Sequence, residues 1–368
     1  MSGRMVDAIQ FPALHLRGEL EEKILAGERI DREEALALYH ACDLLSLGAM
    51  AHALSLARRP HAREVVTYVV DRNINYTNVC LSQCRFCAFW RPPGHPEAYV
   101  ISWPQLAAKL EETLALGGNQ ILLQGGLHPE LDLGFYEELL ARIRASYPIH
   151  VHGFSPPEIL HIARQSRRSV PEVLKRLKAA GLGSIPGGGA EVLVDRVRTE
   201  ISPQKCTARE WLGVMEAAHR LGLRTTATMM FGQRETVAER IEHLLAVRAL
   251  QDRTGGFTAF IPWPFQPQNT ALGGESTSAL DYLKTLALSR IVLDNFANLQ
   301  ASWVTQGPQV GQIALLFGAN DLGSTMIEEN VVRAAGTAYC LAEAELRRLI
   351  ADLGLLPRRR NVFYELLD

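Results

Sequence analysis

The chain has 368 residues and a hydrophobic fraction of 47%, which is enough to bury a large core and excludes an intrinsically disordered protein. Lysine and arginine total 38 against 40 for aspartate and glutamate, and this net charge of −2 argues against a nucleic-acid binder or a protein of anionic membrane surfaces. No apolar run reaches the roughly 18 residues of a membrane span, and the first ten residues contain no apolar signal core, so we expect a cytoplasmic protein.

Residues 1–60 are expected to form an N-terminal helical segment. Asp31 and Glu34 have the spacing of a capping box, in which the two side chains satisfy the free N–H groups at a helix start. Stretches rich in alanine and leucine follow, and Arg58 to Pro60 end the helical pattern. We therefore place a domain boundary at residue 60.

From residue 61 to residue 325, short β-rich runs alternate with longer amphipathic stretches. The expected strands are 65–70, 119–126, 149–155, 181–189, 224–232, 257–265, 299–304 and 313–321. The expected helices are 103–117, 133–146, helical stretches up to residue 180, 207–221, 236–252 and 278–296. Ser102 is the expected cap of the first of these helices, and Thr207 with Glu210 opens the fourth.

This alternation predicts an α/β protein with a parallel sheet. About eight βα units over about 260 residues suit a TIM-type (βα)8 barrel, and an open doubly wound sheet is the alternative. Residues 326–368 are expected to be a C-terminal helical extension that packs on the barrel. In such a barrel the chemistry takes place on the loops that follow the strands.

The six cysteines are unevenly distributed. Cys80, Cys84 and Cys87 fall within eight residues, in the spacing C-x3-C-x2-C, directly after the first barrel strand. A disulfide framework spreads its cysteines and belongs to small secreted chains, so this cluster indicates metal or redox chemistry.

Three thiolates on one loop can bind three corners of an iron–sulfur cube and leave the fourth iron open to a small molecule. A structural zinc site is the alternative, with His95 as the nearest fourth ligand. Zinc loops usually pair two C-x2-C knuckles, and the sequence has no second one. The missing fourth ligand therefore favours the open cluster.

The C-x3-C-x-Phe-C pattern resembles the signature of the radical S-adenosylmethionine (SAM) superfamily. The resemblance implies a 4Fe-4S cluster whose free iron is chelated by SAM, the cosubstrate. It also implies a set of residues that contact SAM, and in this sequence they are Phe86, Gly125, Gly126, Ser155, Glu191 and Arg196.

Each implied SAM contact has its own expected role. Phe86 would lie by the adenine, and the backbone of Gly125 and Gly126 would meet the amino group of SAM, an approach that glycine permits. Glu191 would contact the ribose or the amino group, and Arg196 the carboxylate. A plain turn at the glycines and a solvated ion pair at a helix start are the alternatives.

Longer stretches narrow the resemblance to the futalosine-pathway and deazaflavin radical SAM enzymes, over about residues 60–368. These stretches are 74–78, 87–99, 124–136, 152–159, 226–232, 255–270, 300–307 and 317–331. Residues 90–101, 255–270 and 300–307 favour the ring-closing enzymes of menaquinone biosynthesis. Aminofutalosine synthase and the deazaflavin ring-forming subunit are the alternatives, and a non-enzymatic metal or electron-transfer protein is the alternative of another class.

The implied substrate is dehypoxanthine futalosine. A 5′-deoxyadenosyl radical would take hydrogen from C4′ of its ribose, and the carbon radical would add to the benzoate ring. The adduct would then lose one proton and one electron to regain aromaticity. The resemblance also implies a low-potential electron donor such as flavodoxin or ferredoxin.

The reaction requires a base, which histidine suits because its pKa lies near neutral pH. His128 and His152 follow the second and third strands, and His150 shares the face of His152 because it is two residues earlier. Asp321, Glu328 and Glu329 follow the last strand, and a carboxylate there could bind ribose hydroxyls or act as base; Asp321 and Glu328 are the two that we select. Structural histidines and helix capping are the corresponding alternatives.

The benzoate of the substrate needs hydrogen-bond donors, and Arg91, Thr305 and Gln306 are the candidates. Arg358 to Arg360 form a basic run that we expect to be a solvated face, and binding of a phosphate or of a lid carboxylate is the alternative.

Overall fold

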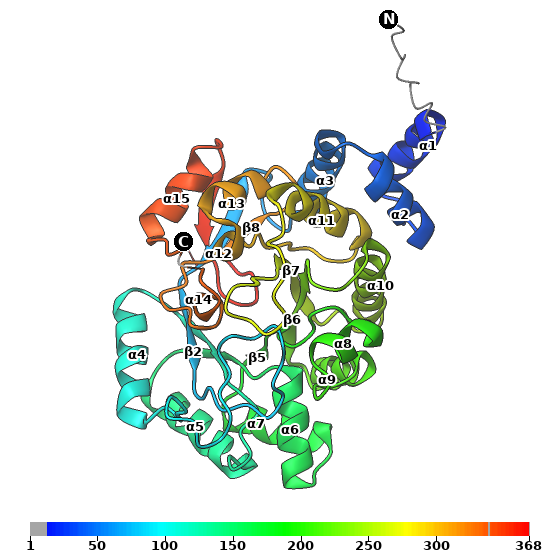
Figure 1. The fold of residues 1–368 in the computed structure, drawn as a ribbon. Coiled ribbons are helices and arrows are strands. Elements are labelled where there is room, and N and C mark those ends of the chain that lie inside the picture. The colour runs from blue at the N-terminus through cyan, green and yellow to red at the C-terminus, as the bar shows by residue number, and fades with distance from the viewer. Residues whose placement is uncertain (1–12, 338, 368) are drawn as a thin grey trace, which may run out of the picture.

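The computed structural model describes residues 13–337 and 339–367, so residues 1–12 of the expected helical segment lie outside the described residues. Strands form the centre of the molecule and helices surround them (Figure 1). The strands are β1 (Val65–Val69), β2 (Asp71–Asn75), β3 (Gln120–Gln124), β4 (His150–Gly153), β5 (Ser184–Ile185), β6 (Arg224–Phe231), β7 (Phe257–Pro264), β8 (Asp321–Ser324) and β9 (Leu356–Arg359).

The helices lie between the strands and at the start of the described chain. They are α1 (Ala13–Leu25), α2 (Arg32–Ala41), α3 (Leu44–Arg58), α4 (Trp103–Ala115), α5 (Leu133–Ser146), α6 (Pro156–Ser166), α7 (Val170–Ala180), α8 (Asp195–Ile201), α9 (Ala208–Arg220), α10 (Val237–Thr254), α11 (Ala279–Val292), α12 (Trp303–Gln306), α13 (Pro308–Ala314), α14 (Val331–Ala334) and α15 (Glu343–Ala351). The predicted caps Asp31, Ser102 and Thr207 are confirmed, because each forms a capping box with the residue three positions on.

The strands form two parallel sheets that together make a barrel. One sheet has the order β2-β3-β4-β5-β6-β7 and the other the order β8-β1-β9. Only Val70 separates β1 from β2, so one extended stretch belongs to both sheets. On the other side, Leu299 pairs with Phe260 of β7 and Gln300 pairs with Asp321 of β8. These links confirm the predicted TIM-type barrel.

The last two predicted strands were misplaced. Residues 299–304 contribute only the two single-residue bridges at 299 and 300, and α12 begins at Trp303. Residues 313–321 were also wrong as a strand, because α13 continues to Ala314 and β8 begins at Asp321. Pro308 starts α13 at the first helical position, which suits proline. A short apolar run does not distinguish a helix from a strand, and this caused the error.

The segment 326–368, predicted as a helical extension, also contains strand β9. It pairs in parallel with β1, from Val65 opposite Leu356 to Tyr68 opposite Arg359. β9 lies at the edge of its sheet, where a proline such as Pro357 is tolerated. The proline and the following arginines hid this strand from a search for apolar alternation.

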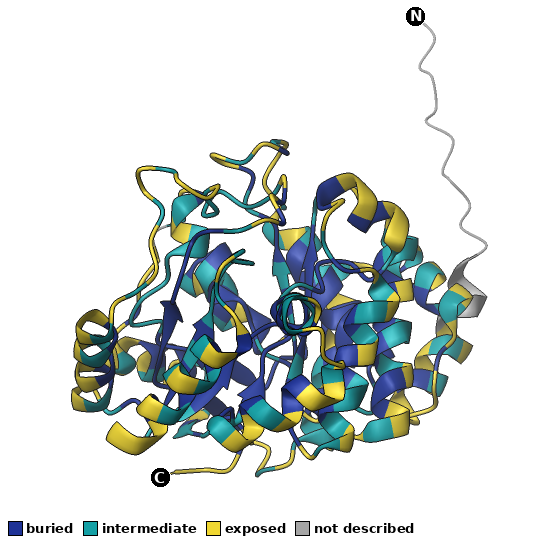
Figure 2. Ribbon diagram, turned by 90° about the horizontal axis from the view of Figure 1, so that it is seen from below, coloured by how far each residue is buried: buried dark blue, intermediate teal, exposed yellow. Residues whose placement is uncertain are grey.

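The barrel wall is buried and the outer faces of its helices are exposed (Figure 2). α3 packs against α11 and α2 against α10, so the helices that precede β1 cover one side of the barrel. No described helix combines the length and the apolar character needed to cross a bilayer.

Candidate active site

A cavity of about 340 Å³ occupies the barrel interior and reaches the loop that follows β2. Phe86, Cys87 and Ala88 of that loop line it, together with inward side chains of the strands. The segment 300–305 and the residues after β9 complete its wall. A cavity of this size suits a small-molecule ligand.

The cysteine loop is tied into a closed turn. The backbone N–H of Cys80 donates to the carbonyl of Arg91 (3.1 Å), and the N–H of Arg91 donates to the carbonyl of Asn78 (2.8 Å). The guanidinium of Arg91 also donates to the carbonyl of Ala88 (3.1 Å) and pairs with Glu97 (2.7 Å). Arg91, predicted to bind the substrate, therefore holds the loop and does not line the cavity.

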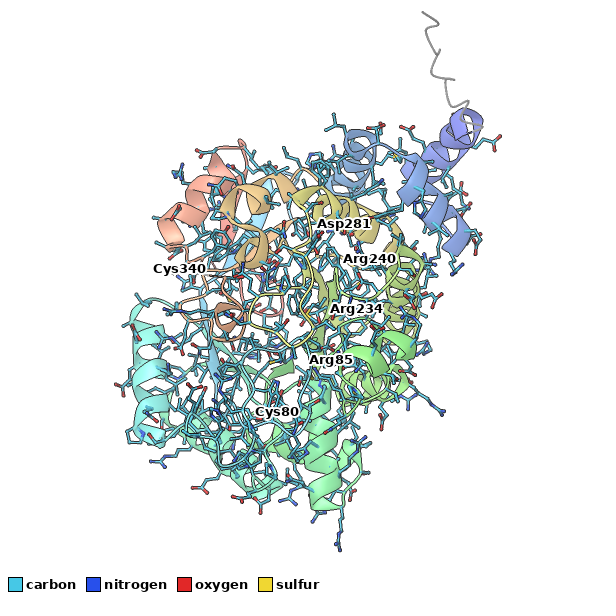
Figure 3. All side chains as sticks on the ribbon, in the orientation of Figure 1. Cys80, Arg85, Arg234, Arg240, Asp281 and Cys340 are labelled. Carbon is cyan, nitrogen blue, oxygen red and sulfur yellow. The ribbon has the colours of Figure 1, made fainter. Side chains whose placement is uncertain are left out.

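The thiols of this loop suit a cationic cluster. Burial raises the pKa of Cys84 to about 12 and also raises the pKa of Cys87 above its ordinary value. Desolvated thiols become thiolates when a metal centre compensates their charge, as an iron–sulfur cluster does. Among the described residues, no three histidine, cysteine or carboxylate side chains are grouped so as to hold a single metal ion. Figure 3 places Cys80 on this loop and Cys340 well apart from it.

The glycine pair after β3 is required by close packing. A Cβ on Gly125 would lie 2.5 Å from the ring of Tyr76, and one on Gly126 would lie 2.1 Å from the carbonyl oxygen of Val79. The N–H of Gly125 donates to Glu158 (3.0 Å) and that of Gly126 donates to a loop carbonyl (3.1 Å). Neither glycine lines the cavity, and because both N–H groups are occupied, only the carbonyl oxygens of the pair remain as acceptors for a ligand amine.

Ser155 caps α6 and does not line the cavity. Its hydroxyl donates to Glu158 (2.6 Å), whose other oxygen accepts from the hydroxyl of Tyr76 (2.7 Å). Burial raises the pKa of Glu158. This network links the start of α6 to the glycine pair, so Ser155 supports that pair from behind.

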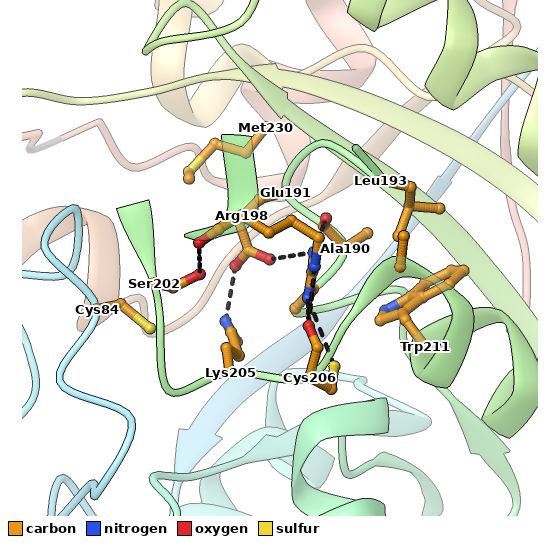
Figure 4. Close-up of polar contacts among 12 residues, drawn as sticks. Cys84, Ala190, Glu191, Leu193, Arg198, Ser202, Lys205, Cys206, Trp211 and Met230 are labelled. Carbon is orange, nitrogen blue, oxygen red and sulfur yellow. Dashed lines mark hydrogen bonds and ion pairs between the residues drawn. The ribbon is translucent and has the colours of Figure 1, made fainter. Parts of the chain in front are cut away.

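Glu191 lies in a buried charged cluster beside the cysteine loop (Figure 4). One carboxylate oxygen is 2.7 Å from Nζ of Lys205, and the other is 3.6 Å from Arg198 and has no hydrogen-bond partner. Glu191 has a positive φ of 42°, a costly backbone conformation for a residue with a side chain. Glu191 does not line the cavity, and its second oxygen is a buried acceptor without a hydrogen bond.

Lys205 and Arg198 were missed by the sequence interpretation. The ammonium of Lys205 lies 5.2 Å from the ring centre of Phe86 and electrostatically affects the thiol of Cys84. The guanidinium of Arg198 donates to the carbonyls of Ala190 and Cys206 (2.5 and 2.9 Å). Nothing in the spacing along the sequence indicated these contacts.

Arg196 is placed away from the cavity. Its side chain is 53% exposed and forms two hydrogen bonds with Glu239, at 2.6 and 2.7 Å. This pair lowers the pKa of Glu239 to about 2. Arg196 therefore forms the solvated ion pair that was the alternative to a contact with SAM.

Among the four predicted catalytic residues, His152 alone lines the cavity. Its Nδ1 is 2.7 Å from the hydroxyl oxygen of Ser184, and burial lowers its pKa to about 3. His128 stands in a surface turn, where its Nδ1 accepts from the N–H of Glu130 (3.1 Å).

The two predicted carboxylates are engaged elsewhere. Asp321 is fully buried and forms an ion pair with Arg360, at 2.5 and 2.9 Å. Glu328 pairs with Lys109 (2.5 Å). Glu329, the third carboxylate of that group, lines the cavity together with Asp71, which was not predicted, and burial raises the pKa of both.

Thr305 lines the cavity as predicted for a substrate contact, with its hydroxyl 2.8 Å from that of Ser302. Gln306, the next residue, does not line it. Arg360 does, although we expected the basic run 358–360 to be a solvated face. Only 4% of Arg360 is exposed, so that expectation was wrong for this residue. The ion partner of Arg360, Asp321, lies far away in the sequence, so the residues next to Arg360 do not indicate that its side chain is buried.

The barrel and the three-cysteine loop define a radical SAM enzyme. Residues 74–247 match the model of the radical SAM superfamily, and residues 254–368 match that of the CofH/MqnC C-terminal region. The fold is shared with the FeFe-hydrogenase maturase HydG from Carboxydothermus hydrogenoformans, at a TM-score of 0.76 and 16% identity, over 95% of this chain and 81% of that one. Methylornithine synthase gives a TM-score of 0.71 at 16% identity, over 92% and 97% of the two chains.

The relatives found by sequence share a larger fraction of identical residues with this chain than these two structures do. Two proteins named cyclic dehypoxanthine futalosine synthase are 45% identical, one from Halalkalibacterium halodurans over 94% of both chains and one from Streptomyces coelicolor over 94% and 87%. A 5-amino-6-(D-ribitylamino)uracil–L-tyrosine 4-hydroxyphenyl transferase from Archaeoglobus fulgidus is 43% identical over 84% of this chain and 91% of its own. The chain therefore belongs to the CofH/MqnC group of the radical SAM superfamily, whose enzymes use a 4Fe-4S cluster and SAM.

Proposed function

We propose that this protein converts dehypoxanthine futalosine to cyclic dehypoxanthine futalosine in menaquinone biosynthesis. The observation that carries the proposal is one cavity that both Cys87 and the segment 300–305 line. That segment favours the ring-closing enzymes, and the two 45% identical relatives bear that name over nearly the whole chain.

Cys80, Cys84 and Cys87 would hold the cluster, and Glu191 and the carbonyls of the glycine pair would hold SAM. When bound and reduced, the cluster supplies one electron to SAM, which yields methionine and a 5′-deoxyadenosyl radical. The buried Lys205–Glu191 pair keeps charged groups beside the cysteine loop without exposing them to water. A water-poor site protects a radical from side reactions.

The cavity wall suits a substrate with an aromatic acid and a ribose. Met230, Trp263 and Val304 provide apolar surface, and the paired hydroxyls of Ser302 and Thr305 leave one O–H that can donate to a carboxylate. These contacts would keep the ribose C4′ and the benzoate ring close together, which favours ring closure over diffusion of the radical.

His152 is the proposed acceptor of the proton that the adduct loses. Its low pKa keeps the imidazole neutral at working pH, so a ring nitrogen has a free lone pair. The electron that leaves with the proton passes to a one-electron acceptor. We also infer a cytoplasmic location and a low-potential donor such as flavodoxin or ferredoxin, in keeping with the near-zero charge.

The test gives the anaerobically reduced enzyme SAM with dehypoxanthine futalosine and follows 5′-deoxyadenosine and product by mass spectrometry. Cyclised product with one equivalent of 5′-deoxyadenosine is expected. A parallel reaction supplies L-tyrosine and 5-amino-6-(D-ribitylamino)uracil, the substrates in the name of the Archaeoglobus fulgidus relative. Product in that reaction alone would replace the proposal with the transferase function.

A further inference from the structure

Two histidines and a serine form a continuous hydrogen-bonded chain inside the barrel. His150 and His152 lie on β4 and project to the same face, because successive side chains of a strand alternate. Ser184 of β5 pairs in register with His152. Its hydroxyl oxygen is 2.7 Å from Nδ1 of His152 and 2.7 Å from Nε2 of His150.

The two histidines at the ends of this hydrogen-bonded series line different cavities. His152 lines the active-site cavity, whereas His150 lines a second cavity of about 480 Å³, formed by the loops before β3, β4 and β5 and by residues 361–367. That cavity is at the opposite end of the barrel, where the strands begin. Nε2 of His152 and Nδ1 of His150 are the ring nitrogens that the hydrogen bonds to Ser184 leave unused.

The ring of His150 is held in a fitted slot. A Cβ on Gly183 would lie 2.3 Å from its Cε1, so only glycine leaves room for the ring. Phe363 packs edge-to-face against the other side, with ring centres 5.3 Å apart. The close contacts keep Nε2 directed at the serine hydroxyl.

We propose that His152, Ser184 and His150 are a proton relay that carries the proton released on rearomatisation from the cavity to the opposite end of the barrel. This inference rests on the proposed function, which requires one proton to leave the adduct in each turnover. It assigns His150 and Ser184 to the reaction, although neither lines the active-site cavity.

In each turnover, Nε2 of His152 takes the proton from the carbon of the adduct while Nδ1–H of His152 passes its proton to Ser184. The serine hydroxyl gives its own proton to Nε2 of His150, and Nδ1–H of His150 releases a proton to water in the second cavity. The accompanying electron goes to a one-electron acceptor, by class an oxidised iron–sulfur cluster, and is not carried by these residues.

The protonation states of the two histidines favour proton transfer from His152 to His150. Burial, with smaller effects of His150 and Arg360, lowers the pKa of His152 to about 3, and burial lowers the pKa of His150 to about 4. Both rings are therefore neutral at rest, so the hydroxyl between them donates to one and accepts from the other. A protonated His152 is unfavourable, which drives the proton onward to the ring that reaches water.

The test compares His150→Ala with His219→Ala as a matched control. His219 is also part-buried and also has a pKa lowered to about 4, and it lies 2.7 Å from two hydroxyl oxygens where His150 has one, but it lines neither cavity. The readouts are the rate of cyclised product, the ratio of 5′-deoxyadenosine to product, and the response to added imidazole.

We expect H150A to lose product formation about tenfold or more, in line with general acid–base effects, while 5′-deoxyadenosine continues to form. The ratio of 5′-deoxyadenosine to product should rise by a similar factor, and imidazole should restore product through the second cavity. H219A should keep the wild-type ratio. Loss of packing alone would lower both products together and would not respond to imidazole.

A wild-type ratio in H150A would overturn the relay. If H150A does not fold by circular dichroism, Ser184→Ala decides in the same way, because it removes the central hydroxyl and leaves both rings. If the wild-type enzyme forms no cyclised product, the proposed function fails. A wild-type enzyme that cyclises, beside an H150A that keeps its ratio, means that the relay alone fails.

Discussion

Replacement of Arg360 by methionine should strongly destabilise the barrel. Arg360 and Asp321 have side-chain exposures of 5% and 0%, and their atoms meet at 2.5 and 2.9 Å. R360M removes the cation and leaves the carboxylate buried. It also removes the guanidinium that stacks 3.9 Å over the ring of Tyr364, so the segment after β9 loses its main anchor.

The magnitude follows from what Asp321 keeps. Breaking a buried pair by removing one partner typically costs about 3–5 kcal/mol. Asp321 retains the hydroxyl of Thr67 (2.6 Å) and the N–H of Gly323 (2.9 Å), so we expect the lower part of that range, about 3 kcal/mol. The double variant R360M/D321N should lose less than R360M alone, since it no longer buries an uncompensated charge.

The assay is urea unfolding of the cluster-free protein, followed by circular dichroism. Arg164→Met is the control, because the Arg164–Glu210 pair has a similar contact of 2.7 Å but side-chain exposures of 60% and 39%. An exposed pair contributes about 0–1 kcal/mol, so R164M should change the free energy of unfolding little. If R360M costs no more than R164M, or if the two replacements in the double variant are additive, the reasoning about burial is refuted.

Further outcomes follow from the same structure. C80A, C84A and C87A should each lose bound iron and turnover while the far-UV circular dichroism is unchanged. C340A, at an exposed position, should keep its iron and its turnover. Unfolding of all three loop variants would instead indicate a structural metal. Gly126→Ala should prevent the cysteine loop from closing and lower the iron content, because its Cβ would lie 2.1 Å from a backbone oxygen, whereas Gly213→Ala in α9, with no atom within 4 Å, should add up to about 1 kcal/mol of stability. Glu191→Gln should raise the Kd of SAM about tenfold in equilibrium dialysis, a loss of about 1.4 kcal/mol, and an unchanged Kd would remove Glu191 from the SAM site. Buried His243 has its pKa lowered to about 3, so it contributes stability that is lost as the pH falls below about 6.5. His243→Gln should therefore flatten the decline of unfolding free energy between pH 6 and pH 4 by about 1.4 kcal/mol per pH unit, and an equal slope would show that His243 titrates normally.

The barrel was predictable because its main strands carry local signals. Alternating βα runs, the three caps and the cysteine spacing are all contained in short windows of sequence, and each led to the correct element. The final strands were missed because 299–300 contribute single bridges and because β9 contains a proline and arginines. In both cases pairing with a distant strand, not local propensity, decides the structure.

The candidate site shows the same division. Phe86, Cys87, His152 and Thr305 follow predicted strands or motifs, and all four line the cavity. Arg360 and Lys205 could not be found in this way, because burial and an ion partner far along the chain define their roles. Arg196 fits the expected spacing, yet its Glu239 partner holds it at the surface.

The pairing of β9 with β1 also governs how the molecule is made. Residues 65–68 pair with residues 356–359, which leave the ribosome much later. The wall formed by β2 to β7 can therefore assemble during synthesis while the side of the barrel at β9 is still open. Arg360 and Tyr364 follow β9 directly and line the cavity. This part of the cavity wall therefore forms only after residues 356–364 have been added to the chain.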